Sequence, residues 1–298
     1  MAKKNSSKGF ILTVALVLLG VIVGVALAVF LFIYVLPEKS GPKEPLTKLS
    51  KHIPEELPKI ARPEEENIPL PRIKPRVAIV IDDMGADLKR MRELFDVDTQ
   101  ITVAVLPYLR HSKKVATEAH NSRGWEVILH LPMEPKGFDS GETGKNPGKG
   151  ALFTNMSVAD IKAQVEDDIK DVPFADGINN HMGSRFTEDM VLMKVVLDVA
   201  KGHRLFFLDS RTTADSVAGK AARSMGVKSA ERAVFLDNTR DVDYVKKQVA
   251  ELVSVAKHKG SAIAIGHPYP ETIIALKESV GYLKENGIEV VRLSELVK

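Results

Sequence analysis

Short apolar runs alternate with amphipathic stretches from residue 76 to residue 298. The first run, 77–81, contains five consecutive apolar residues, which is typical of a strand buried on both faces in a parallel sheet. The pattern predicts strands at 77–81, 101–106, 125–129, 177–180, 205–208, 234–236, 261–265 and 288–291. It predicts helices at 86–95, 112–122, 157–171, 189–201, 215–225, 242–259 and 271–286. This alternation favours the α/β class, as a closed or nearly closed (β/α) barrel of seven or eight parallel strands.

A different pattern precedes this barrel. Residues 10–36 carry no charged side chain, and a run of about 27 residues is long enough to span a bilayer. The run exceeds the apolar core of a cleaved signal peptide, so we expect one uncleaved transmembrane helix after a short basic tail at 1–9. Residues 37–75 hold nine of the 16 prolines, mixed with Lys and Glu, which is typical of an extended linker. The expected order is therefore tail, anchor, linker and a barrel domain at 76–298.

Composition narrows the chemistry. The formal net charge is +3, and Lys3, Lys4 and Lys8 account for all of it. A nucleic-acid-binding surface therefore has no support, and we expect no nucleic-acid partner. The chain has no cysteine, which excludes disulfides, thiolate metal ligands and cysteine nucleophiles.

Acidic and imidazole side chains recur where the predicted strands end. These residues are Asp82, Asp83, His130, His181, Asp209, Asp237 and His267. The carboxyl ends of parallel strands open onto one face of a barrel, so we expect these side chains to meet there. Carboxylate and imidazole ligands without thiolate suit Zn²⁺, or another first-row divalent ion, at a catalytic site. Such a set allows metal-assisted hydrolysis, in which a carboxylate takes a proton from water and a histidine protonates the leaving group.

The adjacent acids Asp82 and Asp83 are expected to differ in role. Successive strand residues point to opposite sides, so one acid would bind the cation while its neighbour handles a proton. The alternative is that one of them caps the helix predicted to begin near Ala86. A phosphoacceptor domain also ends its first strand in paired acids, but it needs an Asp at the end of the third strand, where this chain has His130.

Five motifs stand at the predicted strand ends. They are IDDMG at 81–85, HLPMEP at 130–135, NNHMGS at 179–184, FLDSRT at 207–212 and IGHPYPET at 265–272. Together they resemble the divergent branch of the polysaccharide deacetylases, which is found in bacterial envelopes. The resemblance covers 76–298 and implies a deacetylase-like barrel. It also implies that Asp82 is the base, that Asp83 and His130 bind the metal and that His267 is the general acid.

The motifs depart from the family pattern at one ligand position. The family has a His-x-x-x-His pair, but the residue four positions after His130 is Glu134. Either Glu134 is the third ligand, or His181 on the next strand completes the site. Other residues are expected to bind or orient the substrate or the catalytic groups: Asp209 or Asp237 beside the acid, Arg185 or Arg211 beside the base, and Tyr269 next to His267.

The resemblance implies a membrane-anchored hydrolase, with zinc as the expected ion, that removes N- or O-acyl groups from an envelope polysaccharide or peptidoglycan-type glycan. Basic residues flank the apolar segment on both sides, so charge alone does not orient it. The glycan chemistry predicts a single pass through the inner (cytoplasmic) membrane, with the C-terminal domain on the periplasmic or extracellular side. The alternative is a carbohydrate-binding or scaffold protein of the envelope that keeps the same barrel with little or no turnover.

Overall fold

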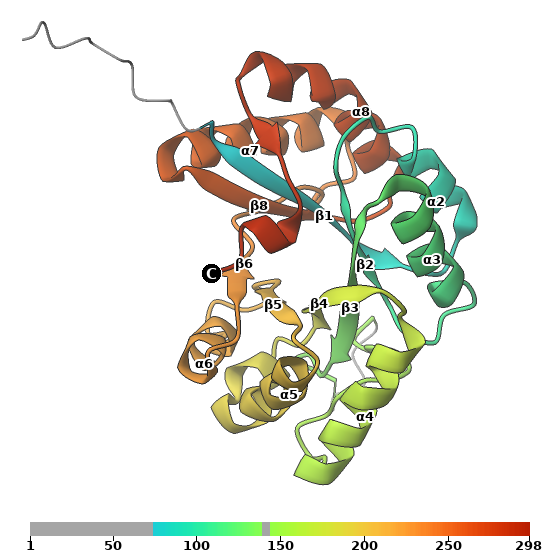
Figure 1. Cartoon of the computed structure of the whole chain (residues 1–298), viewed down its shortest axis with the longest axis vertical. Coiled ribbons are helices and arrows are strands. Elements are labelled where there is room, and N and C mark those ends of the chain that lie inside the picture. Colours follow the sequence, from blue (N-terminus) through green and yellow to red (C-terminus); the bar gives the residue numbers. More distant parts are fainter. Residues whose placement is uncertain (1–73, 139–143) are drawn as a thin grey trace, which may run out of the picture. The chain divides into compact units, whose positions relative to one another are not determined.

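Nine parallel strands form one curved sheet, and the helices lie on its outside (Figure 1). The computed structural model describes residues 74–138 and 144–298. The strands are β1 (Arg76–Met84), β2 (Thr102–Val105), β3 (Glu126–Met133), β4 (Ala175–Met182), β5 (Phe206–Asp209), β6 (Ser229–Glu231), β7 (Val234–Phe235), β8 (Ser261–Gly266) and β9 (Glu289–Val290). The helices are α2 (Leu88–Leu94), α3 (Ser112–Arg123), α4 (Val158–Asp171), α5 (Met190–Gly202), α6 (Ala218–Met225), α7 (Val242–Lys259) and α8 (Pro270–Glu285), with 3₁₀ turns at Phe186–Glu188 and Leu293–Glu295. The α/β class and the parallel sheet are confirmed.

The sheet curves like a barrel but stays open between β6 and β7. Its order is β6-β5-β4-β3-β2-β1-β8-β7, with β9 beside β1. Only Arg232 and Ala233 join β6 to β7, whereas parallel neighbours need a crossover of roughly a dozen residues or more. The short link crosses the opening between the two sheet edges. The Arg232 N–H donates to the Asp209 carbonyl on β5, and the Ala233 N–H donates to the Ile263 carbonyl on β8. The closed or nearly closed barrel of seven or eight strands is therefore corrected to an open sheet of nine.

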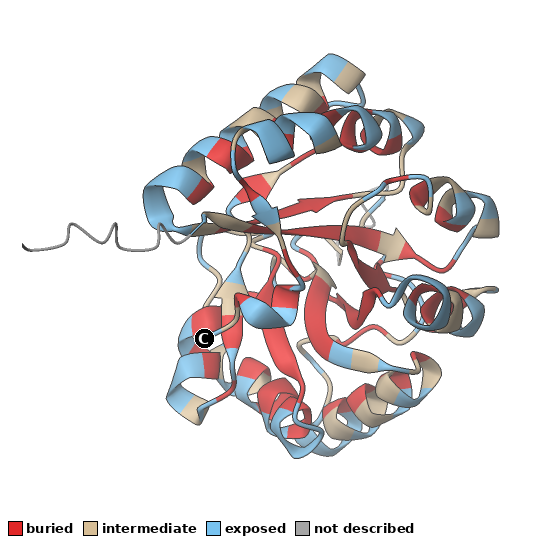
Figure 2. Ribbon diagram, turned by 45° about the horizontal axis from the view of Figure 1, so that its top comes forward, coloured by how far each residue is buried: buried red, intermediate tan, exposed pale blue. Residues whose placement is uncertain are grey.

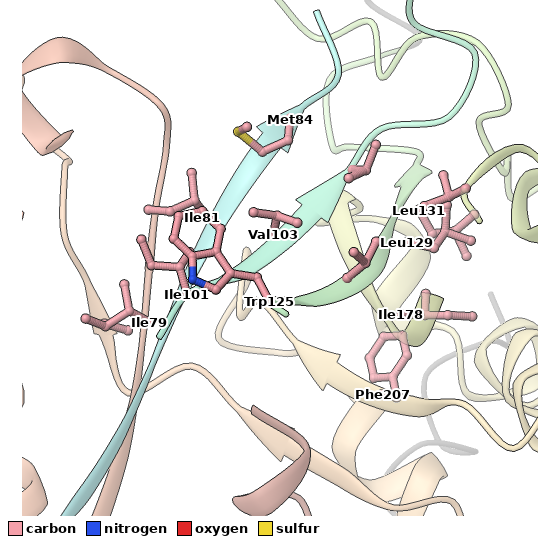
Figure 3. Packing of buried hydrophobic residues seen from close by; sticks show 14 of the residues in the cluster. Ile79, Ile81, Met84, Ile101, Val103, Trp125, Leu129, Leu131, Ile178 and Phe207 are labelled. Carbon is pink, nitrogen blue, oxygen red and sulfur yellow. The ribbon is translucent and has the colours of Figure 1, made fainter. Parts of the chain in front are cut away.

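Strand β1 is apolar on both faces because each face packs against a different part of the chain. Ile79 and Ile81 belong to the large cluster that the helices cover, part of which Figure 3 shows. Ala78 and Val80 belong to a smaller cluster on the other face, which the C-terminal segment completes through Leu293. Figure 2 shows the strands as a mostly buried layer. Burying each isoleucine side chain contributes about 1.5–3 kcal/mol, which explains why an unbroken apolar run is needed here.

Side-chain caps begin several of the helices around the sheet. Ser157 accepts a hydrogen bond from the Asp160 N–H at 3.1 Å, which confirms a capped start for the helix predicted at 157–171. Helix α2 is capped by Asp87, whose carboxylate accepts from the Lys89 N–H at 2.7 Å. Capping therefore occupies neither Asp82 nor Asp83, and the helix-cap explanation of that pair is wrong.

The described residues belong to a unit that spans Ile68–Lys298. Within residues 74–138 and 144–298, no helix combines the length and the apolar character needed to cross a membrane. The predicted anchor at 10–36, and all but the last two residues of the linker, lie outside the described residues, so both stay predictions.

Candidate active site

The carboxyl ends of the strands surround a cavity of about 460 Å³. Its lining includes two carboxylates, three imidazoles and two arginines, from Asp82, Asp83, His130, His181, His267, Arg211 and Arg232. These side chains come from β1, β3, β4, the loops after β5 and β8 and the link between β6 and β7. Parallel pairing thus brings together residues that lie far apart in the sequence, as the strand-end pattern predicts.

Three potential ligand atoms face one another in this cavity. Asp83 Oδ1 lies 2.9 Å from His181 Nδ1 and 3.2 Å from His130 Nε2. The two imidazole nitrogens are 3.2 Å apart. Asp83 Oδ1 is buried and receives no well-formed hydrogen bond, although both rings face it. The three side chains form a group that offers one ligand atom each.

The spacing of this group fits a divalent ion of the size of zinc. Ligand atoms at 2.0–2.2 Å in a tetrahedral site lie roughly 3.3 Å from one another, close to the three distances observed. One carboxylate and two imidazoles are also a ligand set that divalent first-row metals accept, with a fourth position left for water or substrate. Burial alone would raise the pKa of Asp83, but the facing imidazoles of His130 and His181 outweigh it and hold that pKa well below its usual range.

Asn179 fixes the orientation of the buried members of the site. Its Oδ1 lies 2.8 Å from His130 Nδ1, and because an amide oxygen only accepts, the ring proton is assigned to Nδ1. His130 Nε2 is therefore the potential ligand atom, and it lies 3.2 Å from both Asp83 Oδ1 and His181 Nδ1. The Asn179 amide nitrogen donates to Asp82 Oδ1 at 2.9 Å and to Ser210 Oγ at 3.1 Å. The fully buried Asn179 side chain thus connects His130, a potential ligand, to the Asp82 carboxylate.

Asp82 is the buried carboxylate beside the potential metal group. It is 4% exposed, and its Oδ2 lies 3.6 Å from His130 Nε2. Burial raises the pKa of Asp82 and outweighs the opposing charges of His130 and His267. Arg232 is a nearby cation, and its guanidinium donates to the carbonyls of Ser210 at 2.7 Å and Arg211 at 2.9 Å.

His267 is held by a carboxylate from the neighbouring strand end. His267 Nδ1 lies 3.0 Å from Asp237 Oδ1, and Asp237 Oδ2 accepts from the His267 N–H and from Thr272 Oγ1. His267 Nε2 then points toward the cavity, 3.7 Å from Asp83 Oδ2. Burial disfavours the imidazolium, but the hydrogen bond to Asp237 and the charge of Asp83 outweigh it and raise the pKa of His267. Of the two acids expected beside His267, the structure brings Asp237 to it.

The backbone at Asp83 departs from the strand geometry that the sequence suggested. Asp83 has φ of 56°, in the left-handed region, and the register with β2 shifts between Ile81 and Met84. The two acids therefore do not alternate across the sheet, and both reach His130 from the same cavity. Met182 and Arg211, which also line the cavity, have φ of 52°. Left-handed non-glycine residues are costly and cluster at functional sites.

Glu134 does not belong to the group of potential metal ligands. One carboxylate oxygen lies 2.9 Å from Arg185 Nη1, and the other accepts the Thr154 N–H. Glu134 and Arg185 line a separate cavity of about 390 Å³. Of the two alternatives for the third ligand, the geometry favours His181. Arg185 is paired with Glu134 and not with Asp82.

The remaining predicted residues lie around the site in different positions. The Asp209 carboxylate is fully buried and accepts from the Arg211 N–H at 2.8 Å and from Ser216 Oγ at 2.7 Å, so it shapes the loop after β5. Arg211 lines the cavity, but its guanidinium donates to the Ala214 carbonyl. Tyr269 stacks on His267 with ring centroids 5.3 Å apart and is outside the cavity lining. The position of Tyr269 therefore favours a role in orienting His267 over direct contact with a sugar.

Asn179 and Arg232 are the two site residues that sequence reasoning missed. The sequence does contain a sign of Asn179: the strand predicted at 177–180 has polar residues at positions 179 and 180. An amide in a buried strand needs partners, which here are His130 and Asp82. No local pattern marks Arg232, whose position depends on the gap between β6 and β7.

Comparison with known proteins identifies the family of this chain. The model of the divergent polysaccharide deacetylase family matches residues 79–297. The uncharacterized protein YibQ of Escherichia coli K12 is 38% identical over 228 residues, which are 76% of this chain and 69% of that protein. An uncharacterized protein of Haemophilus influenzae Rd is 38% identical over 221 residues, which are 74% of this chain and 76% of that protein.

A solved structure shares the fold. The crystal structure of the uncharacterized protein ATU2773 from Agrobacterium tumefaciens C58 has a TM-score of 0.70 with this chain at 24% identity. The similarity covers 75% of this chain and 89% of that one, and it supports the fold alone. The family model and the two relatives, in contrast, match over most of the chain's sequence. This chain belongs to the divergent polysaccharide deacetylase family.

Proposed function

We propose that this chain is a metal-dependent hydrolase that removes N- or O-acyl groups from an envelope polysaccharide or peptidoglycan-type glycan. The observation that carries the proposal is the triangle of Asp83, His130 and His181 beside a buried carboxylate and an Asp-backed imidazole. In this proposal the triangle holds a divalent ion, with zinc expected. The ion would supply a Lewis acid for the acyl carbonyl and for the attacking water.

The protein groups supply the proton transfers. Asp82 is held at one oxygen by Asn179, and its other oxygen accepts the proton of the attacking water. His267 Nε2 then protonates the leaving amine or hydroxyl, while Asp237 holds the ring and stabilises its charged form. The cavity places both groups on the same side as the potential metal ligands.

The location belongs to the same proposal. The uncharged segment at 10–36 supports a single-pass anchor in the inner membrane, and a glycan substrate requires the catalytic domain on the periplasmic or extracellular side. The linker at 37–75 would hold the domain away from the membrane surface.

Acyl release by the purified chain tests this proposal. We expect zinc-loaded protein to release acetate from an acetylated glycan, and Asp82→Asn and His267→Ala each to lower kcat by about 10²–10⁴-fold, the usual contribution of a general base or acid. Both variants should keep their metal. A metal-loaded chain that binds acetylated glycan without releasing acetate would instead establish the non-catalytic binding protein.

A further inference from the structure

A second cavity lies on the same edge of the sheet and has no part in the proposed chemistry. It has a volume of about 390 Å³ and follows the carboxyl ends of β3 and β4. Its lining is Glu134, Phe138, Phe153, Thr154, Asn155 and Arg185. We refer to it as the Phe138–Phe153 pocket.

The strands that carry two of the potential metal ligands lead directly to this pocket. Glu134 follows His130 by four residues, and Arg185 follows His181 by four. β3 and β4 pair from Val127 to Met133, and the Arg185 N–H then donates to the Glu134 carbonyl. Four extended residues span at most about 14 Å, which limits the Cα distance between the ligands and the pocket. A short linear oligosaccharide can therefore reach from the potential ligands to the pocket.

The floor of the pocket is polar and fixed in place. The Glu134 side chain is 4% exposed and is held by Arg185 and by the Thr154 N–H. The Arg185 side chain is 44% exposed, so the ion pair can be reached from solvent on one side. The two charges offset each other, which suits an uncharged ligand with hydroxyl groups more than an anion.

The walls of the pocket are two phenyl rings. The Phe138 and Phe153 rings have centroids 5.0 Å apart with a tilt of 41°, and both residues are partly exposed. Partly exposed aromatic faces beside a few fixed polar groups are a usual design for binding a polar ring with an apolar face. By contrast, the Tyr269 ring is already packed by His267 and lies 3.8 Å from the Arg240 guanidinium carbon.

We infer that the Phe138–Phe153 pocket binds an uncharged sugar unit of the glycan, one that flanks the acylated unit at the potential metal site. This inference rests on the proposed function and extends it, because it makes the protein selective for oligosaccharides over single sugars. The Glu134 position then serves substrate binding through its ion pair with Arg185, and not the metal.

The probes are a monomer-to-pentamer series of β-1,4-linked N-acetylglucosamine and the small ester 4-nitrophenyl acetate, assayed with the zinc-loaded full chain in detergent. We expect kcat/KM to rise with chain length in the unmodified protein. Phe153→Ala or Phe138→Ala should lower the ratio of kcat/KM for the pentamer to that for the ester by roughly tenfold, mainly through KM. Phe153→Leu, which keeps apolar volume without a ring, should lower the same ratio. Phe174→Ala, an exposed phenylalanine outside the pocket, is the matched control and should leave the ratio unchanged.

Ratios that stay unchanged in all three pocket variants, with melting temperatures equal to that of the unmodified chain, would overturn the inference. Calorimetric titration of the metal-free chain with the N-acetylated pentamer, which stays uncharged, separates this outcome from failure of the proposed function. Pentamer binding that Phe153→Ala and Phe153→Leu weaken supports the pocket even if no acetate is released. The absence of pentamer binding by the unmodified chain would overturn the inference even if the small ester is hydrolysed.

Discussion

At the scale of single residues, the site depends on a few polar side chains that hold one another in place. Asn179 orients His130 through one amide atom and Asp82 through the other. Asp237 orients the His267 ring through a hydrogen bond to its Nδ1. Residues that hydrogen-bond to metal ligands set the orientation of the ligand ring and its basicity, so their loss lowers metal affinity and activity.

The identity of the third ligand is tested by a pair of substitutions. His181→Ala should remove the bound ion, because it deletes one corner of the ligand triangle. Glu134→Gln should keep one equivalent of metal and lower the free energy of unfolding by about 1 kcal/mol, because the ion pair between Glu134 and Arg185 is lost. Metal analysis and denaturant unfolding measure the two effects. Loss of metal in Glu134→Gln with retention in His181→Ala would reverse the assignment.

Asn179→Ala should weaken metal binding by roughly 10–100-fold, because the His130 ring loses the acceptor that fixes it. The matched control is Asn180→Ala, which removes the same atoms one residue along. Asn180 bonds to the Met182 carbonyl and the Ser210 N–H, not to a potential ligand. A competition assay with a chelating dye gives both affinities. Equal losses in the two variants would mean that Asn179 acts only through stability.

At the scale of elements, the sequence predicted the strands with long apolar runs and the residues at their ends. It placed the starts of β1, β3 and β8 within one residue because these strands open with apolar runs, but it ended β1 at 81 and β3 at 129, before their structural ends at Met84 and Met133. It predicted β7 at 234–236 but missed β6, because a three-residue strand carries too little periodicity. It left the third ligand open, because the choice between Glu134 and His181 depends on the register between β3 and β4.

A buried acid joins α4 to the segment after β2 and makes this contact sensitive to pH. Asp168 on α4 is fully buried, accepts from Gln164 at 2.8 Å and lies beside Tyr108. Burial raises the pKa of Asp168 from 3.8 to about 7. The folded protein therefore binds this proton more tightly than the unfolded chain does. Its contribution to stability is complete below pH 3.8 and is lost as the pH rises through 7.

Asp168→Asn should remove this pH dependence, because the amide stays neutral. Relative to the unmodified chain, the variant should gain about 2–3 kcal/mol of unfolding free energy between pH 5 and pH 8. Urea unfolding at both pH values gives this difference. The exposed Asp167→Asn on the same helix is the control and should show a much smaller change. A difference that does not vary with pH would contradict the buried, protonated state of Asp168.

At the scale of the whole molecule, one edge of an open parallel sheet carries every group that the proposed chemistry needs. The chain belongs to the divergent polysaccharide deacetylases, and in the proposed site Asp83, His130 and His181 would form the ligand triangle, with His181 supplied by the strand next to that of His130. The proposed anchor would keep this edge close to a substrate in the envelope.

The most direct measurement is the metal content of the full chain, purified in detergent without chelators or a polyhistidine tag. The account predicts one equivalent of zinc or a similar divalent ion per chain. Asp83→Asn, which keeps the side-chain shape, should lose that ion while its far-ultraviolet circular dichroism stays unchanged. A chain that holds no ion even after incubation with excess zinc, manganese or cobalt would contradict the account, as would an Asp83→Asn variant that retains a full equivalent.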